Sequence, residues 1–299
     1  MTVAGQSTED IQRHIEKAKS AAGTTWAKAA DYFCAESSMP NRPTDPAIQP
    51  TKLFDNLSVV GSVGTAMYVL ETSQGLIVID GGYPGETDSV LIPGLKALGL
   101  DPARVRYMLV AHGHSDHFGA ARQFQEAYGT KVFLTAADWD LLEAPQPAAK
   151  GPAAPAPKRD QVIQDRQPII LGETKILPMF VPGHTPGAAA FVFDVTDRGK
   201  KYTAGLFGGT VLSAGFVTTP GLEQYVQSVA LYAKFAADNH VDVEIQNHPL
   251  MDGFAQKLEL LKKRGPQDPH PFVVGEAGYR AFMDVISECS QAQLARRKK

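Results

Sequence analysis

The hydrophobic pattern of the chain switches repeatedly between short apolar runs and apolar residues at helical spacing. Short apolar runs bounded by Gly, Pro or Asp are typical of buried strands. They predict strands at 57–60, 67–70, 76–79, 107–110, 131–134, 169–171, 175–181, 188–193, 202–207 and 241–245. Helical spacing predicts helices at 9–20, 24–33, 86–98, 118–128, 136–142 and 222–237, with a further helical pattern near the C-terminus. This alternation is typical of an α/β fold.

One hexapeptide, residues 112–117 with the sequence His-Gly-His-Ser-Asp-His, concentrates metal-binding side chains directly after a predicted strand. Imidazole nitrogen and carboxylate oxygen are donors that suit Zn²⁺. In an extended segment His112 and His114 point the same way, because side chains alternate with a period of two. The turn into the next helix can bring Asp116 and His117 to a neighbouring point. The spacing therefore offers two adjacent donor pairs and predicts two metal ions.

Two further histidines lie at the ends of predicted strands, where a rigid scaffold can aim them. His184 lies in a Pro-Gly-His-Thr-Pro-Gly turn, and His248 follows the strand-like segment 243–245. Proline follows each of them closely and restricts the local backbone. We therefore interpret both as metal ligands. The other histidines lack this context, and we expect them to be surface residues: His14, His240 and His270.

Taken together, these motifs resemble the metallo-β-lactamase superfamily of zinc hydrolases. The resemblance extends from about Leu57 to His248 and includes the segment 77–82 (Ile-Val-Ile-Asp-Gly-Gly), which is similar to the strand and turn that enter the site in that family. It implies two similar αβ halves that form an αββα sandwich. The metals would then lie in a cleft at one edge of two mixed β-sheets.

The resemblance also implies a ligand set and a cofactor, two zinc ions per chain. Asp116 would be a catalytic residue as well as a ligand, because it would orient the nucleophile. Asp80 would be a carboxylate behind the ligands that fixes a ligand imidazole and raises its basicity. The implied ligands are His112, His114 and His184 for the first zinc, and Asp116, His117 and His248 for the second.

A diagnostic segment follows the turn that carries His184. Enzymes similar to glyoxalase II and to the quorum-quenching lactonases have a metal-bridging aspartate there, whereas the corresponding segment 206–211 (Leu-Phe-Gly-Gly-Thr-Val) has Gly209 at that place. It has no cysteine either. The chain is therefore most similar to the third subclass of metallo-β-lactamases, which has histidine at the place of His117 and no bridging carboxylate.

Composition limits the classes of partner. The 299 residues suffice for one large α/β domain or two small ones. A net charge of −3 offers no basic surface for nucleic acid, and no apolar stretch approaches the ~20 residues needed to span a bilayer. We therefore expect a small-molecule substrate, no nucleic-acid partner and no membrane insertion. The sequence leaves the oligomeric state open.

The two cysteines, Cys34 and Cys289, lie in helical segments near opposite ends of the chain and outside the metal motifs. They form either a disulfide, which would imply an oxidising compartment, or two unrelated buried thiols. Residues 1–10 are polar and lack the apolar core of a signal peptide. Two localisations therefore stay open: an intracellular protein, or an exported (periplasmic or secreted) mature form if the cysteines are bridged.

We expect two parts of the chain, an N-terminal helical extension over 1–50 and a metallo-hydrolase domain over 51–299 that ends in a helix. The segment 144–158 is rich in proline and alanine. It is too rich in proline for the interior of a helix or a sheet. We interpret it as a surface connection or, because it follows the half that carries the first ligands, as a loop beside the site.

Three functions fit the ligand set. The first is zinc-dependent hydrolysis, in which a zinc-bound hydroxide attacks the carbonyl of a cyclic amide of the β-lactam type. The second is hydrolysis of an ester, lactone or thioester by the same fold. The third belongs to another class, an iron-dependent oxidoreductase.

Substrate preference should depend on the diagnostic segment. The third subclass carries serines near Gly209 and Val211 that help to hold the substrate carboxylate, and here Thr210 and Ser213 are the available substitutes. We therefore expect modest β-lactam turnover beside ester or lactone hydrolysis. We also expect that serine at position 209 or 211 improves the turnover of β-lactams.

Overall fold

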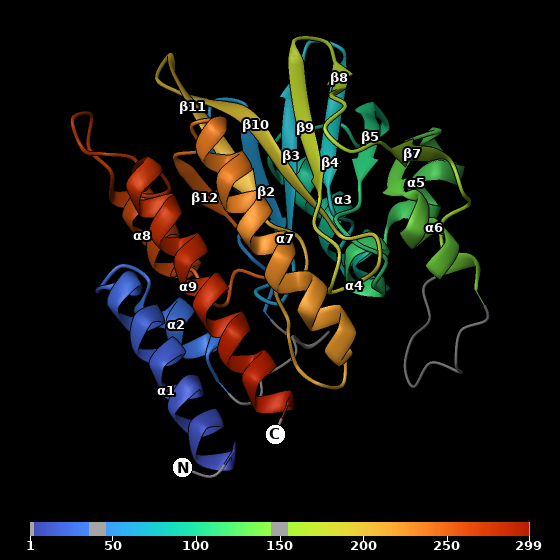
Figure 1. Ribbon diagram of the computed structural model, residues 1–299. Helices are drawn as coiled ribbons and strands as arrows, with labels where there is room; N and C mark the ends of the chain where they lie inside the picture. Colours follow the sequence, from blue (N-terminus) through green and yellow to red (C-terminus); the bar gives the residue numbers. More distant parts are fainter. Residues whose placement is uncertain (1–2, 36–45, 145–154, 299) are drawn as a thin grey trace.

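Two β-sheets face each other in the computed structural model, which describes residues 3–35, 46–144 and 155–298. Helices cover the outer face of each sheet (Figure 1). This arrangement is the αββα sandwich expected from the sequence, and that prediction is confirmed. The expected proline-rich loop lies mostly outside the described residues, as does the whole stretch 36–45.

The first sheet has seven strands in chain order. Neighbours are antiparallel as far as the fourth strand and parallel from there on. The strands are β1 (Thr51–Phe54), β2 (Leu57–Gly61), β3 (Ala66–Thr72), β4 (Gly75–Ile79), β5 (Val105–Leu109), β6 (Lys131–Thr135) and β7 (Gln161–Ile163).

The second sheet has five strands in the order β12, β11, β10, β9 and β8. Its pairs are antiparallel except for β11 and β12. The strands are β8 (Ile169–Leu171), β9 (Thr174–Phe180), β10 (Ala189–Asp197), β11 (Lys200–Leu206) and β12 (Val243–Ile245). Both sheets are therefore mixed, as expected.

Helices pack against both sheets. On the first sheet lie the π-helical turn η1 (Thr87–Leu91), the 3₁₀ turn η2 (Pro102–Arg104), α3 (Ile92–Ala97), α4 (Ser115–Phe118), α5 (Ala121–Tyr128) and α6 (Ala136–Glu143). On the second lie α7 (Thr219–Asp238) and α9 (Gly275–Arg297), and α1 (Val3–Ala22) and α2 (Ala27–Phe33) pack against α9. Helix α8 (Phe254–Lys263) packs with residues of the core between the sheets.

The apolar run of strand β4 is continuous because both faces of the strand are buried. Side chains alternate along a strand, so Ile77 and Ile79 enter the core between the sheets, whereas Leu76 and Val78 enter the core under the helices. Burial of each such side chain stabilises the fold by roughly 1.5–3 kcal/mol. The position of β4 then places Asp80, the residue after it, at the sheet edge.

The structure differs from the predicted elements in several places, among them helix α8, which was not predicted. The short strands β1 and β7 carry few apolar residues and were not predicted. The helix expected at 118–128 begins at Ser115 and is interrupted after Phe118. At Gly119 the helix passes so close to the backbone of Gly82 and Tyr83 that a β-carbon would collide with it. This close approach brings the hexapeptide against the turn after β4.

The prediction that His270 is a surface residue is wrong. Its ring is buried and stacks on Phe54 at a centroid distance of 3.9 Å, and its Nε2 lies 2.7 Å from the carbonyl oxygen of Leu53. Aromatic stacking and a backbone partner satisfy a histidine in a core without a metal. His14 is half-buried and contacts Glu288, whereas His240 is exposed.

Helix α9 joins the N-terminal helices to the second sheet (Figure 1). A disulfide links Cys34, just after α2, to Cys289 in α9. The indole Nε1 of Trp26 donates a hydrogen bond of 2.9 Å to the carbonyl of Gly278. The structure thus contains the bridge, the first of the two alternatives for these cysteines. No helix in the described part of the chain has the length and apolar character needed to cross a membrane.

Removal of the disulfide should destabilise the protein. We expect the double variant Cys34→Ser, Cys289→Ser to lose roughly 2–4 kcal/mol of unfolding free energy, because the bridge restricts the unfolded chain over 255 residues. Urea unfolding of the variant and of the oxidised parent measures the difference. Thiol titration of the denatured, unreduced parent should find no free thiol, and two free thiols would contradict the bridge.

Candidate metal centre

The predicted ligands come from four places at one edge of the sandwich. His112 and His114 follow β5, and the backbone of His114 is extended, with φ −88° and ψ 148°. The short helix α4 then carries Asp116 and His117. His184 follows β9 of the second sheet, and His248 follows β12. Strand ends from both sheets therefore supply the site.

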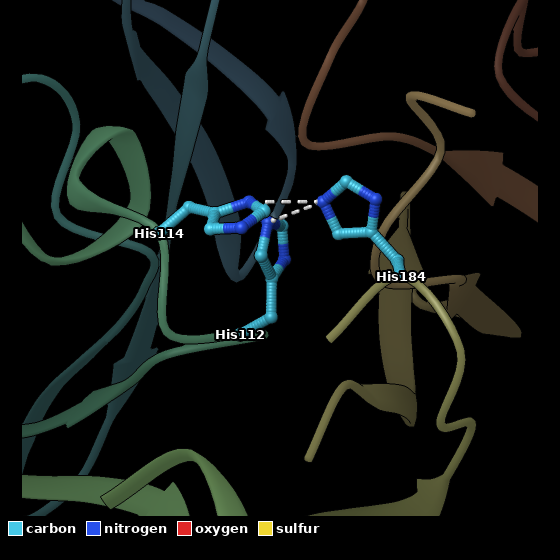
Figure 2. A group of neighbouring side chains, drawn as sticks. All are labelled: His112, His114 and His184. Atoms are coloured by element: carbon cyan, nitrogen blue, oxygen red, sulfur yellow. Dashed lines mark hydrogen bonds between the residues drawn. The ribbon is translucent and has the colours of Figure 1, made fainter. Parts of the chain in front are cut away.

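The first group consists of His112, His114 and His184. The Nε2 atom of His184 lies 3.1 Å from Nε2 of His112 and 3.0 Å from Nδ1 of His114. Figure 2 shows the three rings pointing toward one another from two different segments. All their candidate ligand atoms lie within 4.8 Å of one another, an arrangement that could hold a metal ion.

The second group consists of Asp116, His117 and His248. The Nε2 atoms of the two histidines lie 3.2 Å apart, and Oδ2 of Asp116 lies 3.5 Å from His117 and 3.9 Å from His248. The rings of His112 and His117 are 3.9 Å apart between centroids, so the two groups adjoin. The structure thus brings together all six predicted ligands as two neighbouring triplets.

In each of these rings one nitrogen faces an acceptor outside the site, and this contact determines whether the inward-facing nitrogen carries a proton. Nδ1 of His117 faces the Asp80 carboxylate at 2.7 Å, and Nδ1 of His248 faces the Gly64 carbonyl at 2.9 Å. Each therefore donates its N–H outward, as ligand histidines commonly do. In the neutral rings both Nε2 atoms then carry bare lone pairs, so neither can donate across the 3.2 Å that separates them.

A cation between these nitrogens resolves their repulsion. Ligand nitrogens about 2.0–2.1 Å from a tetrahedral Zn²⁺ lie about 3.3 Å from one another, close to the separations found in both groups. In the first group, Nδ1 of His184 donates to the carbonyl of Val211 at 2.8 Å, so its Nε2 also faces inward without a proton. The donors present therefore fit zinc in number, chemical type and spacing.

Burial favours the neutral rings that metal binding requires. It lowers the pKa of His112 and His184 well below the usual range, and the neighbouring imidazoles add to the effect. Burial, with the neighbouring His117, lowers the pKa of His248 to about 4. His117 differs: burial acts to lower its pKa, but the carboxylates of Asp116 and Asp80 outweigh it and raise the pKa.

Two buried acids hold the ligand segments. Asp80 lies in the left-handed region with φ 63°, and its carboxylate accepts hydrogen bonds from His117 Nδ1 and from the backbone N–H of Ala111, the latter at 2.8 Å. Non-glycine residues seldom adopt this φ, and such strain clusters at functional sites. The carboxylate thereby connects the turn after β4 to both the loop and the helix that carry ligands.

Asp138 in α6 is a functional residue that the sequence reasoning missed. Its carboxylate accepts hydrogen bonds of 2.7 Å each from the backbone N–H of Gly113, the backbone N–H of Gly187 and the hydroxyl of Thr185. One buried side chain thus joins the segment of His112 and His114 to the segment of His184. Its position in a helix gave no signal, because an acid in the first turn of a helix usually serves the helix itself.

The diagnostic segment bears on one expectation. Gly209 has φ +80°, and a β-carbon there would lie 2.5 Å from Cβ of His184. Serine at 209 would therefore crowd the histidine, and this close contact argues against the expectation that it improves turnover. The side chains of Thr210 and Val211 are buried, and the Thr210 hydroxyl has no hydrogen-bond partner among the described residues. Of the two substitute hydroxyls, only that of Ser213 belongs to a half-exposed residue.

A pocket of about 580 Å³ adjoins the first group. His114 and His184 form one part of its wall, and apolar residues of α6 and of the loop before α7 form another, among them Leu141 and Phe216. The first turns of α7 contribute Glu223 and two glutamines. Neither lysine nor arginine is among the described residues that line it.

Comparison with known proteins gives the same assignment. Residues 60–197 match the family model of the metallo-beta-lactamase superfamily. The fold is similar to that of BJP-1, a subclass B3 metallo-beta-lactamase of Bradyrhizobium japonicum, with a TM-score of 0.68 and 25% identity over 85% of this chain and 94% of that one.

Two curated relatives show the breadth of the superfamily. The probable metallo-hydrolase YqgX of Bacillus subtilis is 26% identical over 72% of this chain and 95% of its own length. Ribonuclease J of Mycoplasma pneumoniae is 31% identical, but the match covers only 33% of this chain and 17% of that protein. With this fold and these histidine–aspartate groups, the chain is a metallo-hydrolase whose residues 60–197 form a domain of the metallo-β-lactamase superfamily.

Proposed function

We propose that the protein is a di-zinc hydrolase that opens a cyclic amide of the β-lactam type. The observation that carries this proposal is the convergence of two adjoining triplets of buried or half-buried side chains, in each of which the candidate ligand atoms lie within 4.8 Å of one another. His112, His114 and His184 would hold the first zinc, and Asp116, His117 and His248 the second. Zinc would supply the nucleophile, because it lowers the pKa of bound water to about 7.

The protein's own residues would orient this chemistry. Burial acts to raise the pKa of Asp116, but the nearby imidazoles outweigh this effect and lower the pKa. The carboxylate therefore stays charged and can accept a hydrogen bond from the attacking water. Asp80 holds the ring of His117 by its outer nitrogen. The pocket beside His114 and His184 would hold the remainder of the substrate.

Hydrolysis of an ester or lactone is the second candidate. It is favoured by the buried side chains of Thr210 and Val211 and by the absence of lysine and arginine among the described residues of the pocket wall. A β-lactam carboxylate would there lose charged hydrogen bonds worth about 1.5–3 kcal/mol each. We therefore propose modest lactam turnover with ester or lactone cleavage beside it.

We further propose that the chain works in an oxidising compartment, such as the periplasm or outside the cell. The Cys34–Cys289 bridge supports this localisation, because disulfides persist mainly in such compartments.

Zinc content tests the ligand assignment. After reconstitution we expect about two zinc ions per chain. His184→Ala should weaken mainly the first site and His248→Ala mainly the second, because each removes a ligand from one triplet. Elemental analysis and chelator competition measure both effects. The exposed His240 gives the control, since His240→Ala should keep both ions. Iron as the sole metal of active protein would overturn the assignment.

The stability of the metal-free protein should depend on pH through His248. Its folded-state pKa is about 4, below the unfolded value of about 6.5. Between these values the unfolded chain binds more protons, so stability present at neutral pH is lost as the pH falls toward 4. In His248→Gln we expect this loss to be smaller by up to about 3 kcal/mol. Urea unfolding in the presence of chelator, at neutral pH and near pH 4, measures this loss of stability. Equal losses in His248→Gln and the wild type would contradict the buried neutral ring.

Substitution of the diagnostic glycine tests the substrate site. We expect Gly209→Ser to reduce kcat/KM at least about tenfold, because its β-carbon displaces His184. Gly215→Ser is the matched control in the same loop, where a β-carbon meets nothing within 4 Å. Steady-state rates with a penicillin, a cephalosporin, a carbapenem and an aryl ester measure both variants. Fast ester cleavage without turnover of any lactam would make the second candidate the function.

A further inference from the structure

The loop between β11 and α7, residues 207–218, contacts the first metal group at three points. Gly209 packs against His184, and the carbonyl of Val211 accepts the 2.8 Å hydrogen bond from Nδ1 of that histidine. Phe216 lines the pocket, and its ring centroid lies 6.3 Å from that of His114. The loop therefore sets both the orientation of a ligand and the shape of the substrate pocket.

Within this loop a tight turn carries Phe216. The backbone N–H groups of Phe216 and Val217 donate to the carbonyl of Ser213 at 3.0 and 3.1 Å. Leu212 and Val217, at the two ends of the turn, are buried in the core beneath the second sheet, whereas Phe216 is 50% exposed. The position of Phe216 thus depends on how the two ends are held.

Arg297 holds both ends. Its guanidinium donates from Nη2 to the carbonyl of Leu212 at 2.5 Å and from Nη1 to the carbonyl of Val217. A planar guanidinium presents its donors in a fixed fork, so two acceptors bound together are also held at a fixed separation. Among the described residues no carboxylate lies within ion-pair distance of Arg297, so these carbonyl dipoles are the partners found for its charge.

The helix that delivers this side chain is firmly attached. Arg297 lies in the last turn of α9, which is bonded to the N-terminal helices through Cys289 and packs against α7. A rigid element positions a side chain more precisely than a loop does. The guanidinium thus reaches the loop from a helix that carries none of the six candidate ligands.

We propose that Arg297 is a positioning residue for the first metal site and the substrate pocket. By joining the carbonyls of Leu212 and Val217, it keeps the Val211 carbonyl under His184 and holds Phe216 at the pocket wall. The proposal rests on the hydrolytic function proposed above, since it assigns Arg297 to that same site.

The neighbouring Arg296 provides a matched control. Its guanidinium also donates to two backbone carbonyls, those of Cys34 at 2.8 Å and Ala35 at 3.3 Å. These carbonyls follow α2, outside the loop 207–218. The two arginines therefore make the same kind of contact from adjacent positions of one helix, and they differ in the segment that they hold.

The test compares Arg297→Ala, Arg297→Lys and Arg296→Ala in the full oxidised chain. In Arg297→Ala we expect first-site zinc affinity to fall about tenfold and KM for an aryl ester to rise about fivefold, with second-site affinity within about twofold. Arg297→Lys should recover part of the loss, because an ammonium can bond one of the two carbonyls. Arg296→Ala should lower the free energy of unfolding about as much as Arg297→Ala does, while both zinc affinities and KM stay within about twofold of the wild type.

Chelator competition, steady-state kinetics and urea unfolding supply these values. Millimolar guanidinium should partly restore first-site affinity in Arg297→Ala, with sodium chloride as the salt control. Equal zinc affinities and KM in the two alanine variants would overturn the proposal. A wild-type protein that hydrolyses no substrate would defeat the proposed function, whereas the zinc affinities would still decide the role of Arg297.

Discussion

Convergence of unprotonated, buried nitrogens is the constraint on which the rest of this site depends. In the neutral rings of His117, His184 and His248, each inward Nε2 is bare because the outer nitrogen of the ring donates to a fixed acceptor. Such nitrogens repel one another unless a cation lies between them, so the scaffold must hold them in place. Fixed acceptors and buried backbone provide that support, and they leave the donors spaced as zinc requires.

The sandwich meets this constraint by taking ligands from strand ends of both sheets. Contacts between the halves must then be as well defined as contacts within them. Asp138 supplies one, since its carboxylate binds the backbone N–H groups of Gly113 and Gly187. Asp80 supplies a contact within the first half, between the turn after β4 and α4. Asp80 and Asp138 belong to neither triplet, but their carboxylates hold the segments that carry the triplets in place.

Chemistry and selectivity come from different parts of the chain. The two triplets would activate water for attack on amide and ester carbons alike. Selectivity would depend on the loop 207–218 and the first turns of α7, which shape the pocket. Because Gly209 lies directly against His184, a side chain at position 209 of the same loop would disturb a metal ligand.

The sequence by itself determined the fold class, most strands and helices, and the candidate ligands, because apolar periodicity and a dense His/Asp motif are local signals. Only the tertiary structure decided the contacts of Asp138, the burial of His270 and the close contact of Gly209 with His184. Each depends on which segments distant in the chain come within a few ångströms of one another. Local patterns do not contain that information, because packing between the two sheets sets it.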